Sequence, residues 1–203
     1  MPPRFLYPLL AYRSMVVPFL IVSSIVVPAW LVIRLYYFRR RKGPWSFYRE
    51  FLYLIFAIYL SGLASATLTP NHGSIARAET AAAIDLRPKL ASLVCSSASL
   101  PEDSTQHSFC VRNAGGNVLL FVPLGILIPL VWSRIRFWRG VAIALGVSVS
   151  IELIQYLSRA WGSYRLADVN DVILNVLGAC VGLALLSLLR LRAGNYSILP
   201  RPA

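Results

Sequence analysis

Five long apolar stretches dominate this sequence and limit what it can fold into. Hydrophobic residues make up 57% of the 203 residues, and they come in blocks rather than at helical or alternating spacing. A helix needs about 20 apolar residues to cross a hydrocarbon core of about 30 Å. The sequence therefore predicts an all-α fold, a polytopic membrane helix bundle with about five transmembrane helices. We place these spans at Met15–Phe38, Phe47–Leu68, Asn117–Trp132, Val141–Leu157 and Asp171–Leu189.

The basic residues predict how the helices are oriented. Lysine and arginine total 20 against eight acidic residues, a net charge of +12. The basic residues cluster in alternate loops, at Arg39–Arg49, at Arg134–Arg139 and from Arg190 onward. The positive-inside rule places these loops in the cytoplasm and the N-terminus outside. The charge is thus explained by topology, and without an aromatic platform or a sizeable soluble domain we expect no nucleic-acid partner.

The chain divides into three predicted parts. Residues 1–46 form an additional N-terminal transmembrane helix and a basic cytoplasmic loop, residues 47–189 form the main membrane domain, and residues 190–203 form a cytoplasmic tail. The membrane domain includes an external loop, 69–116, in which short helices are expected at Ala76–Asp85 and Pro88–Ser96.

The cysteines and histidines add one structural prediction. Cys95 and Cys110 both lie in the external loop on the oxidising side, so we expect a disulfide between them. Cys180 lies within the fifth span and is expected to be a small apolar packing residue. His72 and His107 lie in the external loop without metal-ligand spacing, which favours solvated side chains.

Polar residues concentrate in the last three spans, where they are costly. Glu152 and Gln155 lie one turn apart on the fourth span. Asp168, Asp171 and Asn175 share one helix face if the fifth helix begins near Asp168. The third span starts outside, the fourth ends outside and the fifth starts outside, so these groups can converge. The residues expected to line one pocket at the outer leaflet are Asn117, Glu152, Gln155, Arg165, Asp168, Asp171 and Asn175.

Each of these residues also has a purely structural interpretation. The two aspartates could cap a helix N-terminus, where carboxylates accept otherwise unpaired amides. The amides Asn175 and Gln155 could form hydrogen bonds between helices. Glu152 could form an ion pair with Arg165. The sequence leaves both interpretations open.

Three ordered motifs resemble the VanZ-like family of membrane proteins. They are Asn117-Val118-Leu119-Leu120-Phe121-Val122-Pro123-Leu124-Gly125, then Glu152 with Gln155, then Asp168 to Asp171 and Asn175, followed by Gly178 and Gly182. They match N-x-x-x-F-x-P-x-G, E-x-x-Q and D-x-x-D-x-x-x-N, and the likeness covers roughly 47–189. The resemblance implies the family's membrane fold and its association with resistance to glycopeptide antibiotics, teicoplanin in particular. The extra first span and the cysteine pair depart from the family's minimal form.

Two functions remain in competition. The preferred one is binding of an amphiphile, either a lipid-linked cell-wall precursor or a lipoglycopeptide, in the bacterial plasma membrane, with membrane lipids as the other partners and no cofactor. The alternative is a hydrolase or transferase acting on a lipid-linked phosphate or glycan. Glu152 would then be the general acid or base, and Asp168 with Asp171 would hold a divalent cation such as Mg²⁺. Whether turnover occurs and whether the chain oligomerises stay open.

Overall fold

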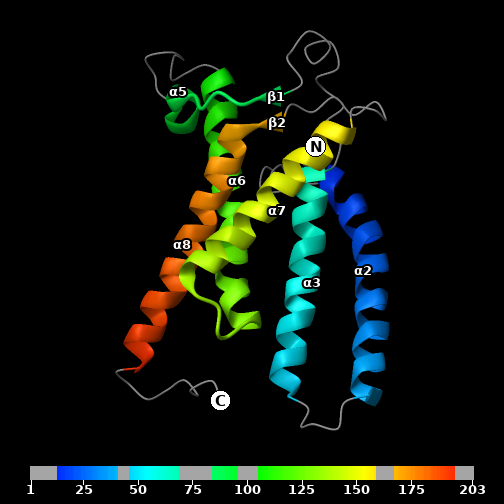
Figure 1. The fold of residues 1–203 in the computed structure, drawn as a ribbon. Helices are drawn as coiled ribbons and strands as arrows, with labels where there is room; N and C mark the ends of the chain where they lie inside the picture. Colours follow the sequence, from blue (N-terminus) through cyan, green and yellow to red (C-terminus); the bar gives the residue numbers. More distant parts are fainter. Residues whose placement is uncertain (1–12, 41–45, 69–83, 96–104, 159–166, 195–203) are drawn as a thin grey trace, which may run out of the picture. The chain divides into compact units, whose positions relative to one another are not determined.

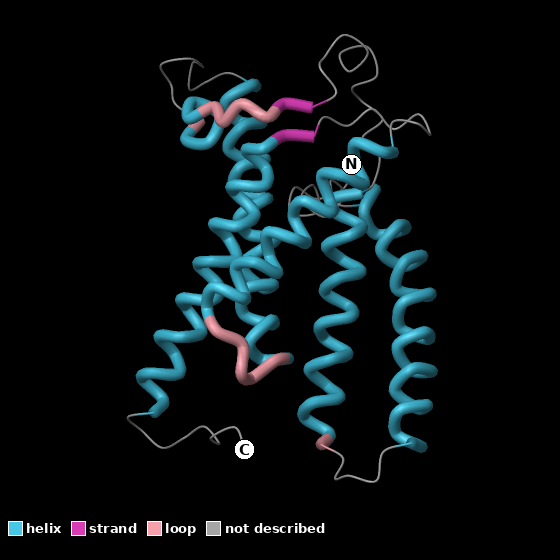
Figure 2. The backbone as a smooth tube through the Cα atoms, in the orientation of Figure 1, coloured by secondary structure: helices cyan, strands magenta, loops and turns pink. Residues whose placement is uncertain are grey.

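The computed structural model describes residues 13–40, 46–68, 84–95, 105–158 and 167–194 (Figure 1). Five of its helices are long and apolar enough to cross a membrane. The predicted fold class is confirmed, because this is an all-α, multi-pass membrane protein. Figure 2 shows that the described backbone is helical apart from short turns and two very short strands. The helices are α2 (Arg13–Arg40), α3 (Phe47–Leu68), α5 (Leu90–Val94), α6 (Thr105–Val131), α7 (Phe137–Leu157) and α8 (Val169–Gly194).

The main error in the predicted boundaries concerns the external loop. The helix α6 begins at Thr105 rather than at Asn117, so Cys110 and His107 lie on a helix and not in a loop. Hydrogen bonds from Asn113 and Asn117 to Asp171 and the disulfide at Cys110 attach this part of α6 to other elements. Residue Asn117 therefore lies inside a helix instead of opening one.

The two short helices expected in the loop fare differently. Residues 76–83 lie outside the described residues, and Ile84–Asp85 form the strand β1 rather than the end of a helix. The second expected helix, Pro88–Ser96, is present as the shorter α5. It ends because Cys95 adopts the left-handed conformation, with a φ of 48°, which α-helices cannot continue.

The chain separates into two compact units, residues 1–70 and residues 71–203. In the first unit, α2 and α3 form an antiparallel hairpin (Figure 1). Arg34 of α2 forms an ion pair with Glu50 of α3, with 2.6 Å between Nε and Oε2. The same guanidinium lies 4.7 Å from the ring centre of Tyr53. Ionic and cation–π contacts thus join the two helices near the turn between them.

In the second unit, α6 and α8 pack with their backbones in contact. A Cβ atom placed on Gly178 would lie 2.2 Å from the carbonyl oxygen of Val118, and one on Gly182 would lie 2.1 Å from that of Val122. On α6, a Cβ on Gly125 would lie 2.1 Å from the carbonyl oxygen of Ala179. Only glycine fits at these three positions. Small residues at i and i+4 are a known means of close helix approach in membranes.

The helix α7 crosses this pair, and the ends of the elements are tied together. Gly140, near the start of α7, lies against the side chain of Leu183 on α8. Near the end of α8, Arg190 donates a hydrogen bond of 3.0 Å to the carbonyl oxygen of Pro129. That carbonyl belongs to the last turn of α6, where no helical amide is left to pair with it.

The opposite end of the second unit carries a small cap. Strand β1 pairs in parallel with β2 (Ala167–Asp168), with Ile84 opposite Ala167 and Asp85 opposite Asp168. The predicted disulfide between Cys95 and Cys110 is confirmed, and it ties α5 to α6. We call the end with β1, β2 and α5 the cap end, and the end with the α6–α7 turn the arginine end.

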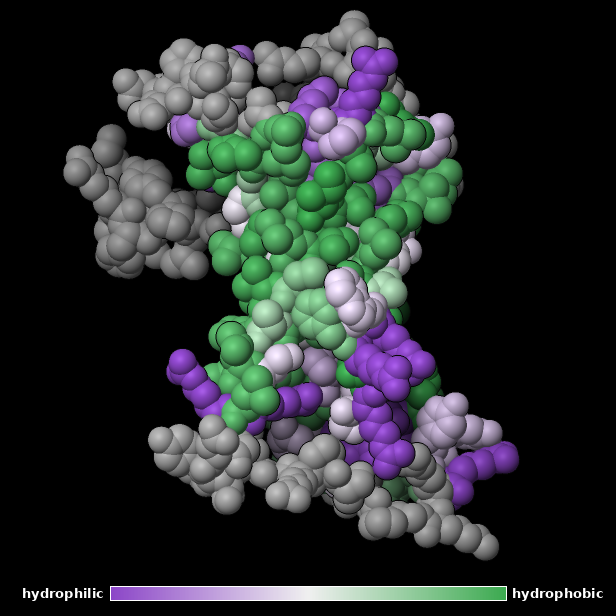
Figure 3. Space-filling view, turned by 60° about the vertical axis from the view of Figure 1, so that its left-hand side comes forward, coloured by the Kyte–Doolittle hydropathy of each residue, from purple (hydrophilic) through white to green (hydrophobic). Residues whose placement is uncertain are grey.

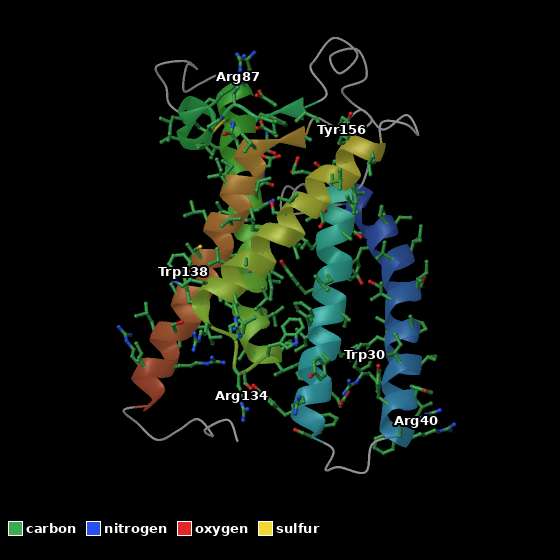
Figure 4. All side chains as sticks on the ribbon, viewed as in Figure 1. Trp30, Arg40, Arg87, Arg134, Trp138 and Tyr156 are labelled. Atoms are coloured by element: carbon green, nitrogen blue, oxygen red, sulfur yellow. A yellow bond between two sulfur atoms is a disulfide. The ribbon has the colours of Figure 1, made fainter. Side chains whose placement is uncertain are left out.

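The surface of the molecule agrees with a membrane location. On the face drawn in Figure 3, hydrophobic residues cover the middle and hydrophilic residues gather towards both ends. Figure 4 places Arg87 at the cap end of the second unit and Arg134 at its arginine end. A bilayer would lie between these two positions.

Candidate functional site

One face of α7 carries buried polar side chains towards the cap end. Ser148 is fully buried, while Glu152 and Gln155 are each 7% exposed. The three residues follow at i, i+4 and i+7, so they share this face. A carboxylate buried at membrane depth costs several kcal/mol unless hydrogen bonds or charges compensate it. The groups around Glu152 therefore decide whether its burial is compensated.

Glu152 is held by the backbone of β2. Its Oε2 accepts a hydrogen bond of 3.0 Å from the backbone N–H of Asp168. Hydrogen bonds from a backbone N–H to a carboxylate are stronger than those between neutral groups. The position of this N–H is fixed in turn by the pairing of β2 with β1. The strands therefore position a donor for a side chain on another element.

Asp168 acts as the N-cap of α8. It lies in β2, just before the helix, and its Oδ1 accepts a hydrogen bond of 2.9 Å from the N–H of Asn170. This is the geometry of an N-cap carboxylate, which also favours the helix dipole. The helix α8 begins at Val169, next to Asp168, so Asp168 precedes the helix as its cap, while Asp171 and Asn175 lie within it. The capping interpretation applies to its Oδ1.

Asp171 connects α8 to α6. Its Oδ1 accepts hydrogen bonds from the side-chain amides of Asn117, at 2.7 Å, and Asn113, at 3.2 Å. The two asparagines lie four residues apart on one face of α6. The bond from Asn117 joins the first sequence motif to the third, across a sequence separation of 54 residues.

Asn175 connects α8 to α7 at a deeper level. Its Nδ2 donates a hydrogen bond of 2.9 Å to the hydroxyl of Ser148, and both side chains are buried. This confirms the interhelical role considered for Asn175. Its Oδ1 is buried and accepts no hydrogen bond from any residue that the structure describes. An acceptor of this kind is costly to bury without a donor.

A further link joins α8 to the cap. The side-chain oxygen of the buried Asn170 accepts a hydrogen bond of 3.1 Å from the N–H of Lys89. The ammonium group of Lys89 lies 2.5 Å from a carboxylate oxygen of Asp85 in β1. The hydrogen bond from Lys89, followed by one from the N–H of Arg87, lowers the pKa of the Asp85 carboxyl. The hydrogen bond to Asp85 raises the pKa of Lys89.

Four residues of the predicted pocket form two of the hydrogen-bonded pairs of this region. Glu152 meets Asp168, and Asn117 meets Asp171. Gln155 is buried on the same face of α7 as Glu152, whereas Arg165 lies outside the described residues. Within the described ranges, no three His, Cys, Asp or Glu side chains come together in a way that could hold a metal ion.

Sequence reasoning missed four participants, Asn113, Ser148, Asn170 and Lys89. Two of them carried a usable signal, since Asn113 precedes Asn117 and Ser148 precedes Glu152 by one helical turn of four residues. Asn170 lies inside the third motif but was passed over as a spacer. Lys89 follows the Asp85-Leu86-Arg87-Pro88 segment, and only the pairing of β1 with β2 reveals its place.

Comparison with known proteins covers most of the chain. A family model described as VanZ/LLP1 matches residues 50–190. The chain is also similar to protein VanZ of Enterococcus faecium, with 33% identity over 72 residues, which are 36% of this chain and 42% of that protein. The chain therefore spans less than half the length of this relative. No solved structure matches the chain.

Proposed function

This chain belongs to the VanZ/LLP1 family, and from that premise we propose that it binds an amphiphile of the bacterial envelope at the cap end of its second unit. The family is associated with teicoplanin-type resistance. The ligand would be a lipid-linked cell-wall precursor or a lipoglycopeptide antibiotic. Binding at the outer leaflet of the plasma membrane would contribute to resistance by sequestering or presenting that ligand.

The observation that carries the proposal is the buried carboxylate of Glu152. It is retained at low exposure, and a backbone N–H of β2 holds it in place. A merely structural contact at this position would not require an ionisable group, because an amide would accept the same hydrogen bond. A carboxylate adds charge, and charged groups inside a membrane protein commonly mark a ligand or ion site.

The surroundings of Glu152 suit a ligand with a polar head and an apolar tail. Beside the buried polar face, α7 exposes Leu153 and Ile154, and α8 exposes Ile173 and Leu177. The polar groups lie towards the cap end, where the positive-inside rule predicts the outer surface. A head group would contact the hydrogen-bonded residues while its acyl or polyprenyl chain lies along the exposed apolar side chains.

One geometric fact keeps the enzyme alternative open. The hydrogen bond between Glu152 and the N–H of Asp168 brings two carboxylate-bearing residues together from different elements. In that alternative Glu152 would be the general acid or base, and Asp168 with Asp171 would hold a divalent cation. Release of a water-soluble product from a radiolabelled lipid-linked precursor would establish turnover, whereas recovery of the intact lipid would favour binding.

The decisive variant is Glu152→Gln. The amide oxygen can still accept the hydrogen bond from Asp168, so we expect thermal unfolding in detergent to change little. Loss of the charge should weaken binding of teicoplanin or of an undecaprenyl-linked precursor by about tenfold. Expression of the variant in a susceptible host should restore teicoplanin susceptibility to the level of the empty vector.

Ser150→Ala is the matched control on the same helix. Ser150 is exposed, and its hydroxyl donates a hydrogen bond to the carbonyl oxygen of Gly146 within the same helix. We expect it to keep binding and resistance. A Glu152→Gln protein that is stable and fully active, or that unfolds several degrees earlier, would refute the functional role of this carboxylate.

A further inference from the structure

The arginine end of the second unit carries five exposed arginines. Arg134, Arg136 and Arg139 lie in the α6–α7 turn and the first turn of α7, and Arg190 and Arg192 lie near the end of α8. We call these five residues the arginine rim. The acidic residues that the structure describes in this unit are Asp85, Glu152, Asp168 and Asp171, and they lie towards the cap end. Within the described residues, no ion pair neutralises the rim.

The rim is a single surface built from the ends of three helices. The hydrogen bond from Arg190 to the carbonyl oxygen of Pro129 holds the end of α8 against the end of α6. The contact between Gly140 and Leu183 holds the start of α7 against α8. Figure 4 shows Arg134 at this end, far from Arg87. The five guanidinium groups therefore act on the same region of the membrane surface.

Aromatic and aliphatic side chains border the rim. Trp138 is 76% exposed and Trp132 is 47% exposed. Leu188 and Leu189 are exposed on α8, next to Arg190. Tryptophan at this depth is typical of the membrane–water interface, and leucine contacts lipid chains. The surface thus combines positive charge with neighbouring apolar groups. This arrangement is complementary to a phospholipid, which has a negatively charged head group and apolar acyl chains.

The start of α7 increases the demand for negative charge. Its N-cap, Arg136, makes no side-chain capping hydrogen bond, and its first turn contains Arg139 and no acidic residue. Positive side chains at the positive end of a helix dipole are unfavourable by themselves. An anion placed among the rim arginines would offset both the dipole and the repulsion between the guanidinium groups.

We propose that the arginine rim binds the phosphate groups of anionic phospholipids in the leaflet at the arginine end. The positive-inside rule assigns this leaflet to the cytoplasmic side. Each guanidinium offers several N–H donors that match phosphate oxygens. The phosphodiester would lie among Arg134, Arg136 and Arg139, with its acyl chains along the exposed leucines of α8.

The test uses the full chain in nanodiscs of dioleoylphosphatidylcholine with a minor fraction of brominated phosphatidylglycerol. Bromine quenches tryptophan only on contact, so the protein carries phenylalanine in place of the other three tryptophans, Trp30, Trp45 and Trp161. Trp132 and Trp138 then report lipids at the rim. We expect stronger quenching by brominated phosphatidylglycerol than by the same fraction of brominated phosphatidylcholine, and a decrease of this preference at high salt. The variant Arg136→Gln with Arg139→Gln should lower the preference about tenfold.

Three further variants complete the test. Arg136→Lys with Arg139→Lys keeps the charge and should keep most of the preference, provided that circular dichroism shows an unchanged helix content. Arg39→Gln with Arg40→Gln removes the same charge from the first unit and should leave the preference unchanged. Arg87→Gln with Arg112→Gln removes the same charge at the cap end and should also leave the preference unchanged. Equal quenching by both lipids, or an equal loss in either glutamine control, would overturn the proposal.

Discussion

The two helix pairs of this protein are held together by different means. In the first unit, the described contacts between α2 and α3 include a polar cluster near the turn, the Arg34–Glu50 ion pair with Tyr53. In the second unit, α6 and α8 meet through Gly125, Gly178 and Gly182 with backbone atoms at the contact. Because α2 and α3 are consecutive in the sequence, with a short connection between Arg40 and Phe47, little loop-closure entropy opposes their pairing. We call the contacts of Arg34, Glu50 and Tyr53 the clasp of the first unit.

The helices α6 and α8 are separated in sequence by α7, so no turn keeps them together. Close backbone contact gives dispersion and weak Cα–H···O interactions along the interface, which are main sources of helix association in lipid. The same pair of helices carries the hydrogen bond between Asn117, which precedes Val118 on α6, and Asp171 in the first turn of α8. The glycines and the polar site therefore depend on the same interface.

The largest effect is expected from filling the glycine contacts. In the double variant Gly178→Ala with Gly182→Ala, each Cβ would overlap a carbonyl oxygen of α6, so the helices must separate. We expect a loss of about 4 kcal/mol in unfolding free energy. Gly62→Ala in the first unit, where a Cβ would lie an ordinary 3.8 Å from Phe19, should change stability little. Unfolding in mild detergent, followed by circular dichroism, measures both.

A second control tests whether helix propensity contributes. Gly146→Ala on α7 places its Cβ in open space, so it should be neutral or slightly stabilising. If Gly178→Ala with Gly182→Ala were as stable as Gly146→Ala, the backbone contact between α6 and α8 would not be the basis of this unit's stability.

The disulfide gives the next largest effect, and it should be confined to the second unit. Replacing Cys95 and Cys110 by serine opens a link across a sequence separation of 15 residues. Chain-entropy arguments give about 3 kcal/mol for such a loop, with smaller values common in practice. We expect faster proteolysis between α5 and α6. The first unit contains no cysteine, so its rate of proteolysis should not change. Cys180→Ser serves as the control, because that thiol forms no disulfide.

The clasp of the first unit should matter less. Glu50→Gln leaves Arg34 without its anionic partner, and because both side chains are partly exposed we expect a loss of about 1 kcal/mol. Arg34→Met combined with Glu50→Leu removes both charges and should be less harmful than either single change. Unfolding of the wild type, Arg34→Met, Glu50→Leu and the double variant in a double-mutant cycle gives the coupling free energy between the two side chains. A coupling of zero would mean that the ion pair does not hold the hairpin.

The smallest effect concerns pH and the ion pair between Asp85 and Lys89. The pKa of Asp85 is lowered in the folded state, so its contribution is present above pH 3.8 and is lost as pH falls through the lowered pKa. The pKa of Lys89 is raised, so its contribution is present below pH 10.5 and is lost as pH rises through the raised pKa. The stability difference between the wild type and Lys89→Met should persist between these limits. A difference that is independent of pH would exclude the ion pair as its cause.

The fold was largely predictable from the sequence because the length and apolar composition of a segment identify it as a membrane-spanning helix. The bounds of α3 match the prediction, and the other spans differ mainly at their ends. The early start of α6 was not predictable, because the hydrogen bonds to Asp171 and the disulfide that attach this part of the helix are tertiary contacts. The strands β1 and β2 were missed because two-residue strands leave no periodic pattern.

The sequence pointed to some of the hydrogen-bonded residues near the cap end, but not to Asn113, Ser148, Asn170 and Lys89 and not to the pairings. The motifs pointed to Glu152, Asp168 and Asp171, yet the sequence did not show that a backbone N–H would hold Glu152. It also left open whether Asp168 caps α8, which depends on where that helix begins. Hydrogen bonds between distant segments follow from tertiary packing, and a single sequence contains no direct record of it.

The contact between α6 and α8 also determines when this protein can finish assembling. During synthesis α6 enters the membrane first, then α7, and only afterwards the segment that carries Gly178 and Gly182. Until then Gly125 and the carbonyls of Val118 and Val122 face lipid or the insertion machinery instead of their helix partner. The second unit can therefore form its central interface only after α8 has entered the membrane, and a chain lacking α8 would present the uncovered surface of α6 to the cell's membrane proteases.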